Sequence, residues 1–243
     1  MGLEIFYDLH APADWSNGRV QDILEKVHDF ALRLGFAEVD SVLPNNPDAP
    51  ETLLIKDTSD AALPPSVNST EGWFFRTWPG EGCETAFFGL CRFPGTVAVN
   101  GVETPTGWGE GWHYHTWCKT QYADRVSREH FLKCHHGVIA ILDAFRAKGV
   151  EVNARDGSGY WEHRDETKLV KQVDEWNRII AAIAGAIKDV ADDYQGSVVS
   201  PIFSAPDFER MEAQGQEIIH RERENATDGL ANESAQEDDS GPR

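Results

Sequence analysis

Two histidines lie two residues apart in one alternating segment, residues 112–122 (Trp-His-Tyr-His-Thr-Trp-Cys-Lys-Thr-Gln-Tyr). A β-strand places every second side chain on the same face, so we expect His113, His115 and Lys119 to lie together. Imidazole groups exchange protons near neutral pH, and an ammonium group stabilises an anion. The same face should also carry Trp117 and Gln121, and the opposite face Trp112, Tyr114, Thr116, Cys118 and Tyr122.

A second alternating segment begins the chain, in residues 3–10 (Leu-Glu-Ile-Phe-Tyr-Asp-Leu-His). Its apolar members Leu3, Ile5, Tyr7 and Leu9 point one way, and Glu4, Phe6, Asp8 and His10 point the other way. If this strand and the histidine strand both lie near the centre of one sheet, Asp8 and His10 converge with His113, His115 and Lys119.

Three interpretations of this polar face follow. Asp8, His113 and His115 can act as ligands of a divalent metal ion that keeps one open coordination position. The same face can instead carry out acid-base chemistry without a metal. It can also be a solvated sheet surface without a function, because His-x-His alone is a weak motif.

Two loops add candidate acids and bases. Glu110 lies between glycines in residues 107–111, just before the histidine strand. Glu162 and His163 can form an acid-base pair in residues 156–165, although the adjacent Tyr160 and Trp161 can equally fill the core. The candidate catalytic residues are therefore His113, His115, Lys119, Glu110, Glu162 and His163.

The run Cys134-His135-His136 resembles a metal motif but lies in a predicted helix. Neighbouring side chains on a helix point about 100° apart, so these three do not form one ligand set. We interpret Cys134 as a core residue on the apolar stripe of that helix, and Cys118 as facing the helices. A catalytic Cys-His pair is the less favoured alternative.

Capping residues and the periodicity of apolar side chains predict the remaining helices and strands. Ser16 or Asn17 begins a helix that ends near Gly35, and Ser127 begins another that ends at Gly149. Aromatic strands are predicted at 73–78 and 85–93, joined by a turn at residues 79–82. Residues 44–72 are predicted as loop with one short strand near 52–55, a third helix begins near Asp165, and a last short helix covers 206–215.

This order predicts an α+β fold: two ferredoxin-like βαβ-type halves that share a mainly antiparallel sheet with helices on one face. Both long helices carry an Asp six residues before the glycine that ends them, Asp29 before Gly35 and Asp143 before Gly149. We expect a single domain over residues 1–215, with halves at 1–105 and 106–215. Residues 216–243 are acidic and poor in large apolar side chains, which predicts a disordered tail.

The formal net charge of −19 disfavours nucleic acid and anionic membranes as partners, because both bind through Lys and Arg. The start of the chain shows no secretory signal, and the apolar run at 179–187 is shorter than the roughly 20 residues of a membrane span. The four cysteines are too scattered for a disulfide framework, so we expect reduced thiols in the cytoplasm.

The favoured function is a small-ligand-binding protein or an enzyme of the hydrolase or transferase type, with its site on the open sheet face. The alternative is a non-catalytic interaction or assembly factor that uses its aromatic sheet face and acidic surface to bind a protein partner. A homodimer that closes the open face is a third arrangement.

Overall fold

The computed structural model describes residues 3–46, 51–54, 66–99, 101–193 and 199–221. Contacts within the chain divide it into two compact units, one ending at Asp165 and one beginning at Glu166.

The first unit is built on one sheet whose strand order is β11-β1-β10-β7-β6-β2, with β3 also paired to β6. Every pairing in this sheet is antiparallel. The strands are β1 (Glu4–Ala11), β2 (Glu38–Val39), β3 (Leu43–Pro44), β6 (Glu71–Trp78), β7 (Ala86–Arg92), β10 (Trp112–Lys119) and β11 (Glu151–Asp156). The two long alternating segments are therefore neighbours near the sheet centre, the arrangement on which the expected convergence of their polar faces depends.

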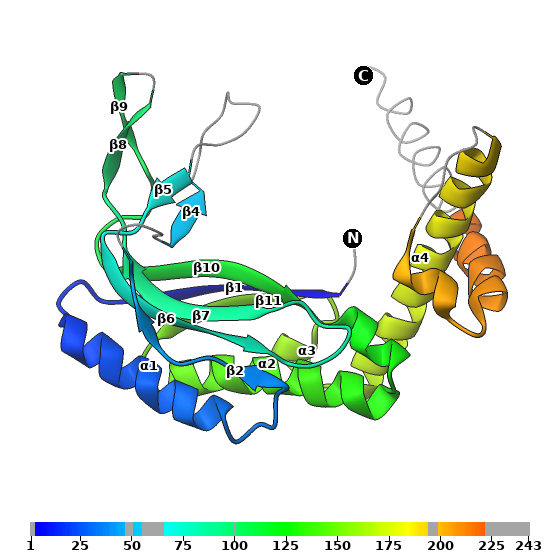
Figure 1. Cartoon of the computed structure of the whole chain (residues 1–243), viewed down its shortest axis with the longest axis horizontal. Coiled ribbons are helices and arrows are strands. Elements are labelled where there is room, and N and C mark those ends of the chain that lie inside the picture. Colours follow the sequence, from blue (N-terminus) through cyan, green and yellow to red (C-terminus); the bar gives the residue numbers. More distant parts are fainter. Residues whose placement is uncertain (1–2, 47–50, 55–65, 100, 194–198, 222–243) are drawn as a thin grey trace, which may run out of the picture. The chain divides into compact units, whose positions relative to one another are not determined.

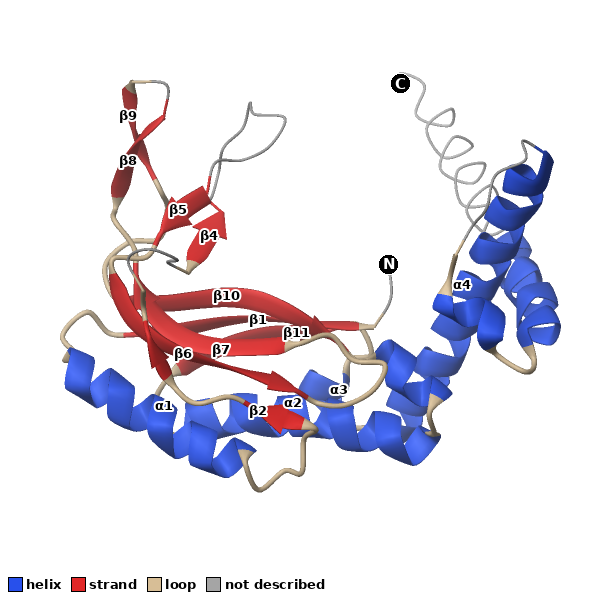
Figure 2. Cartoon of the chain, in the orientation of Figure 1, coloured by secondary structure: helices blue, strands red, loops and turns tan. Residues whose placement is uncertain are grey.

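Helices cover one face of this sheet (Figures 1 and 2). They are α1 (Asn17–Ala31), α2 (Arg128–Ala147) and the short α3 (Tyr160–His163). Two small hairpins stand on the other side of the sheet, β4 (Thr52–Leu54) with β5 (Ser66–Asn68) and β8 (Thr96–Val99) with β9 (Val102–Pro105). The molecule is thus a mixed α+β protein with a mainly antiparallel sheet.

The two long helices begin where their capping serines predict. The Ser16 hydroxyl accepts a hydrogen bond from the backbone N–H of Arg19 at 3.2 Å, and the Ser127 hydroxyl accepts one from His130 at 3.0 Å. The stripe on α1 is buried as expected, at Val20, Ile23, Leu24, Val27 and Ala31. The apolar faces of α1 and α2 pack on one face of the sheet, and polar residues lie on its other face.

Aromatic rings form the centre of the core between the sheet and the helices. Tyr7 of β1 stacks on Phe88 of β7 at 5.4 Å between ring centroids, and Phe88 in turn lies 6.2 Å from Phe145 of α2. Phe75 of β6 completes the cluster at 5.5 Å from Phe88. The apolar side of the first alternating strand is therefore the side that the helices cover, since Leu3, Ile5, Tyr7 and Leu9 are all buried.

The histidine strand ends earlier than expected. β10 stops at Lys119, and the chain turns into a short 3₁₀ helix, η1 (Gln121–Arg125). Gln121 is buried, and its side-chain oxygen accepts the backbone N–H of Leu3 at 3.0 Å. The prediction that Gln121 and Tyr122 continue the strand is wrong, because this hydrogen bond draws Gln121 out of the alternation to satisfy the start of β1.

A buried carboxylate joins the end of β11 to both neighbouring helices. Asp156 accepts hydrogen bonds from the backbone and hydroxyl of Ser158 at 2.9 and 2.7 Å, and from the backbone of Trp161 at 3.2 Å. The Nε2 atom of the buried His135, on α2, lies 3.2 Å from the same carboxylate. Burial alone would raise the pKa of Asp156, but the His135 and Ser158 interactions together lower it below its usual value.

The second unit consists of α4 (Glu166–Asp193), the 3₁₀ turn η2 (Pro201–Ser204) and a helix over residues 208–221. The third and last predicted helices are therefore present, and the last one continues past residue 215. The predicted start of the tail at 216 falls within this helix, and residues 222–243 lie outside the described residues. Every helix in the described part of the chain is too short or too polar to cross a membrane.

The apolar stripe of α4 changes character along its length. Leu169 and Val173 are fully buried, whereas Ile187 and Val190 are 51% and 58% exposed. The sequence predicts a continuous apolar stripe but does not show that its last two turns are uncovered.

Replacement of Asp156 by Asn should destabilise the first unit by about 3–5 kcal/mol, because it removes one partner of a buried pair. The folded-state pKa of Asp156 lies below the unfolded value of about 3.9, so its stabilisation is present above that pH and is lost as the pH falls through the folded-state value. Denaturant unfolding between pH 7 and pH 2 measures this.

The control for this prediction is Asp143→Asn, which removes a half-exposed ion pair with Arg164. We expect it to change the unfolding free energy by at most about 1 kcal/mol. Equal losses in the two variants, or an Asp156→Asn protein with the acid sensitivity of the parent, would contradict the role assigned to Asp156.

Candidate functional site

The sheet face turned away from the helices carries three rows of side chains across β11, β1 and β10. Cross-strand pairing aligns Glu151 with His10 and His113, Asn153 with Asp8 and His115, and Arg155 with Phe6 and Trp117. Glu4 and Lys119 form a further pair beyond these rows. We call these eleven residues the open face, and it contains the convergence that the two alternating segments predict.

The central row contains an aspartate-histidine pair. Asp8 Oδ1 lies 2.7 Å from His115 Nδ1, and the two side chains are 44% and 41% exposed. When Nδ1 carries the ring proton, it donates to the Asp8 carboxylate, and the lone pair lies on Nε2. This is the arrangement in which a carboxylate orients an imidazole so that Nε2 accepts a proton from another group.

The second pair of histidines is arranged differently. The rings of His10 and His113 lie 4.8 Å apart between centroids, and His10 Nδ1 lies 3.3 Å from Glu151 Oε2. The buried Trp108, from the loop after β9, lies 5.7 Å from the His113 ring and 6.2 Å from the His115 ring. His113 thus packs among rings, whereas His115 pairs with a carboxylate.

A divalent metal at Asp8, His113 and His115 does not fit this geometry. In the described part of the chain, no three His, Cys, Asp or Glu side chains are arranged to hold a metal ion. The alternation does place both histidines on one face, but it does not set their rotamers. His113 turns to His10, and His115 turns to Asp8.

Aromatic rings and an arginine border the pair. The ring centroids of Phe6 and the half-exposed Trp117 lie 6.2 Å apart. The Arg155 guanidinium carbon lies 5.2 Å from the centroid of the Phe6 ring. Lys119 is mostly buried and lies 3.4 Å from the Glu4 carboxylate. Arg155 is therefore the more exposed cation of the open face, and Lys119 is already ion-paired.

A hollow of about 540 Å³ lies beside these residues, a volume suited to a small ligand. Five members of the open face line it: Phe6, Asp8, His115, Asn153 and Arg155. The other lining residues are Val152 and Ala154 of β11, Arg146 of α2 and Trp161 of α3. The hollow therefore follows β11, which ends the sheet order.

The loop candidates lie outside this hollow. Glu110 is exposed in the turn before β10, and Glu162 and His163 are exposed on α3. None of the three lines the hollow, whereas the adjacent Trp161 is buried and does line it. Residues 156–165 were interpreted either as an acid-base pair or as aromatic side chains that fill the core. The structure shows the second, packing role for Trp161.

Asn153, Arg155 and Trp108 were not among the candidate residues. Residues 151–155 (Glu-Val-Asn-Ala-Arg) alternate polar and apolar side chains, so the pattern that revealed the other two strands is present here as well. No sequence pattern indicates Trp108, whose position depends on how the β8–β9 hairpin returns to the sheet.

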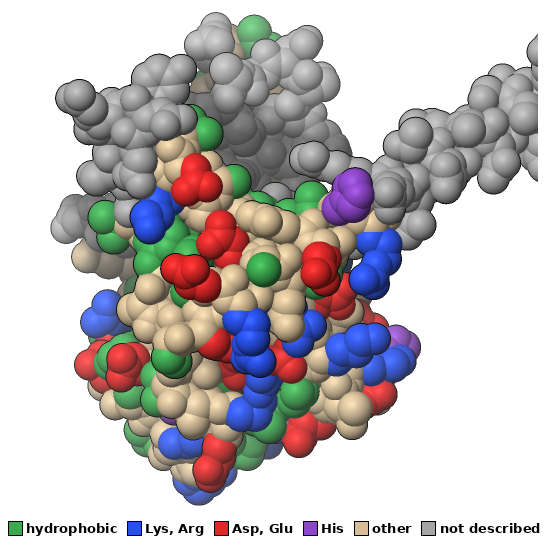
Figure 3. Space-filling view, turned by 90° about the vertical axis from the view of Figure 1, so that its right-hand side faces the viewer, with side chains coloured by type: hydrophobic (Ala, Val, Ile, Leu, Met, Phe, Trp, Pro, Cys, Tyr) green, Lys and Arg blue, Asp and Glu red, His purple; other side chains and the backbone are tan. Residues whose placement is uncertain are grey.

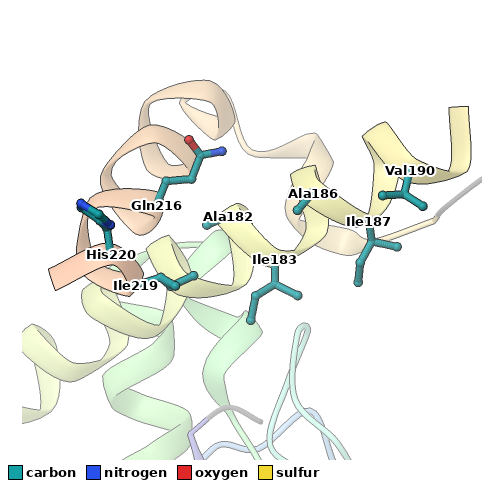
Figure 4. Close-up of a pocket in the computed structure, with 8 residues that line it drawn as sticks. All are labelled: Ala182, Ile183, Ala186, Ile187, Val190, Gln216, Ile219 and His220. Carbon is teal, nitrogen blue, oxygen red and sulfur yellow. The ribbon is translucent and has the colours of Figure 1, made fainter. Parts of the chain in front are cut away.

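The second unit has a hollow of its own, an apolar groove of about 620 Å³ between α4 and the helix over residues 208–221 (Figure 4). Its lining residues are Ala182, Ile183, Ala186, Ile187, Val190, Gln216, Ile219 and His220. The groove offers few polar groups that could orient a substrate, so its chemistry suits apolar packing.

The surface shown in Figure 3 carries acidic and basic side chains interspersed with one another. Comparison with protein-family models, with curated proteins and with solved structures found no match to this chain.

Asp8→Asn should change the tautomer of His115. The carboxylate oxygen accepts only from a protonated Nδ1, whereas the Asn side chain offers both a donor and an acceptor, so the preference for Nδ1–H should weaken. Long-range ¹H–¹⁵N spectra of the imidazoles under alkaline conditions measure this. Glu151→Gln is the matched control, because it affects His10 and should leave the His115 signals unchanged.

Proposed function

We propose that this chain binds a small molecule in the hollow beside the open face and acts on it by acid-base chemistry, as a hydrolase or transferase. The observation that carries this proposal is the Asp8–His115 hydrogen bond of 2.7 Å at the wall of a hollow of about 540 Å³. An oriented imidazole next to space for a ligand is the minimum that general-base catalysis requires.

In this proposal His115 Nε2 accepts a proton from a hydroxyl group or a water molecule, while Asp8 holds the ring and stabilises the imidazolium that forms. Arg155 and Asn153 supply hydrogen-bond donors for an anionic or carbonyl group of the ligand. The rings of Phe6 and Trp117 offer a surface for a planar apolar part. A small aromatic anion has both the negative group and the planar ring that these residues would bind.

The other predicted residues have smaller roles in this proposal. Lys119 adds positive charge at the rim, reduced by its ion pair with Glu4. His113 supports the open face through its contacts with His10 and Trp108. Catalytic roles for Glu110, Glu162 and His163 stay predictions, and their exposed positions outside the hollow do not favour them.

The finer architecture is also a proposal. The order β11-β1-β10-β7 and the two helices that follow β1 and β10 support two ferredoxin-like βαβ-type halves in one sheet. β6 is an additional strand beside β7 in this scheme. The single domain over residues 1–215 stays a prediction.

A cytoplasmic location is supported by four cysteines that are all unbonded thiols. The net charge of −19 supports a protein that binds neither nucleic acid nor anionic membrane.

Ligand binding can be tested with benzoate and phenyl phosphate as probes and benzyl alcohol as the uncharged control. In ¹H–¹⁵N spectra, we expect both anions to shift the Trp117 indole and Asn153 signals. Arg155→Ala should weaken their binding about tenfold, equivalent to roughly 1.4 kcal/mol. Shifts confined to residues away from the hollow would rule out this site.

Turnover separates an enzyme from a binding protein. With p-nitrophenyl esters of acetate and phosphate as probes, loss of the general base in His115→Ala should lower any hydrolysis about 100-fold or more. His10→Ala, on the neighbouring row, should retain most of the rate. Binding without hydrolysis would leave a ligand-binding protein, and hydrolysis unchanged in His115→Ala would exclude His115 as the base.

The alternative function, protein interaction, is favoured by the apolar groove of the second unit. Ile183, Ile187 and Val190 follow one stripe of α4, and the last two are more than half exposed. We propose a second copy of this chain as the partner, because the same stripe on both copies can pack upon itself around a twofold axis.

Light scattering on a size-exclusion column tests this alternative. Ile187→Asp places a charge in the stripe and should shift a dimer to monomer, with at least a tenfold rise in the dissociation constant. Lys188→Asp introduces the same charge one position away, about 100° around the helix, and should leave the dimer intact. A parent protein that is monomeric at high concentration would exclude the dimer.

A further inference from the structure

The strand β11 ends the sheet order, and among the described residues it pairs only with β1. In an antiparallel pair, the backbone groups of successive residues point alternately toward the partner strand and away from it. The backbone N–H of Gly157 donates to the Glu4 carbonyl at 3.2 Å, and these two residues continue the register of β1 with β11. Residues 151, 153 and 155 therefore bond to β1, and the backbone groups of Val152 and Ala154 point outward.

The ends of this outer edge are already used within the chain. The Val150 N–H donates to the Phe145 carbonyl at 3.2 Å, and the Asp156 carbonyl accepts a backbone N–H of the following turn at 2.9 Å. Between these ends, the N–H and C=O groups of Val152 and Ala154 have no hydrogen-bond partner among the described residues. Both residues line the hollow of about 540 Å³, so the space beside them is open. An unpaired strand edge of this kind can add a further strand.

The side chains of β11 are complementary to those of a second, antiparallel copy of the same strand. If Asn153 lies opposite the partner's Asn153, Glu151 lies opposite the partner's Arg155, and Arg155 lies opposite the partner's Glu151. Opposite charges that face each other across a strand pair stabilise it. In the same alignment Val152 lies opposite the partner's Ala154, which brings the outward backbone groups of both strands into hydrogen-bonded pairs. One register thus satisfies the charges and the backbone together.

Both charged side chains are accessible on the open face. Glu151 is 63% exposed, and its carboxylate lies 3.3 Å from His10 Nδ1 and 3.3 Å from Asn153 Nδ2. Arg155 is exposed, contacts the ring of Phe6, and has no ion pair with a carboxylate in the described part of the chain. Two copies of a chain with net charge −19 repel each other, so a surface that joins them must place opposite charges together, as this strand does.

We propose that β11 is a homodimer interface, at which two copies pair antiparallel about a twofold axis at Asn153 and form one continuous sheet. Val152 of each copy exchanges two backbone hydrogen bonds with the partner's Ala154. The ion pairs between Glu151 and the partner's Arg155 flank these bonds on both sides of the axis. The interface is isologous, because each residue and its counterpart make the same contacts.

The added strand leaves the proposed acid-base site accessible. It lies on the far side of β11 from β1 and β10, whereas Asp8 and His115 lie on those two strands. The hollow reaches both residues, so the second copy borders the hollow without covering the pair. Arg155 has five N–H donors and can contact both the partner's Glu151 and an anion. The dimer and the acid-base chemistry therefore do not depend on each other.

Light scattering on a size-exclusion column tests the ion pairs. Glu151→Arg places Arg opposite Arg, and Arg155→Glu places Glu opposite Glu, so each variant alone should raise the dissociation constant of the dimer about 100-fold. Mixing the two variants restores both opposite-charge pairs and should restore the dimer. Asp29→Arg makes the same change of charge on the exposed surface of α1 and should dimerise as the parent protein does. A parent protein that is monomeric at high concentration, or a mixture that stays monomeric, would overturn the proposal.

Amide hydrogen exchange of the parent protein tests the backbone pairing and separates this dimer from one formed through α4. The N–H groups of Val152 and Ala154 should exchange about tenfold more slowly in a dimeric sample than in a dilute, monomeric one. The Asn153 N–H bonds to β1 in both states and is the internal control. A dimer through the α4 stripe would leave the Val152 and Ala154 rates unchanged, and that outcome would exclude the β11 interface.

A cysteine at the twofold axis tests the register. The Cα atoms of a non-hydrogen-bonded antiparallel pair lie about 4.5 Å apart, within the reach of a disulfide. Asn153→Cys should therefore form a covalent dimer with glutathione disulfide as oxidant, and peptide mapping should find position 153 joined to itself. Asp29→Cys carries an exposed thiol on α1 and should stay unlinked. A covalent dimer through Cys83, or none, would contradict the register.

Discussion

The antiparallel register between β1 and β10 is the constraint on which the open face depends. Eight consecutive residue pairs, from Glu4 with Lys119 to Ala11 with Trp112, hold the two strands in one alignment. A slip of one residue would turn every side chain of one strand to the opposite face, which would bury Asp8 against the helices and expose Tyr7. Burial of the apolar set of β1 therefore selects the register, and the register in turn brings Asp8 to His115.

The Asp8–His115 pair and the buried Cys134 differ in their exposure to solvent. The Asp8–His115 pair lies on an exposed sheet face, where proton exchange with a ligand is direct and burial contributes little to its chemistry. Cys134 is fully buried, and its thiol donates to the Pro79 carbonyl at 3.4 Å. An exposed pair is accessible to a ligand from solution, whereas a buried thiol is enclosed by the packing around it.

Buried polar groups tie these regions to the same framework. Asp156 ends β11, the strand that supplies Asn153 and Arg155 to the open face, and its carboxylate holds Ser158, Trp161 and His135. His135 lies on α2, so this helix is also bonded to the strand beside the hollow. The Asp156 network therefore links α2 and α3 to the strand that lines the hollow.

Local sequence determined the faces of the long strands, the capped starts of α1 and α2, and the presence of α4, because alternation, helical periodicity and capping depend on residues within a few positions of one another. The same logic predicted that Asp8, His113, His115 and Lys119 share a face. Only the tertiary structure decided that His115 pairs with Asp8 while His113 packs on His10, that Lys119 is ion-paired with Glu4, and that Gln121 leaves the strand. It alone brought the Pro79 carbonyl to Cys134 of α2, since that contact depends on how closely a glycine-containing turn approaches a helix, a distance that no local pattern encodes.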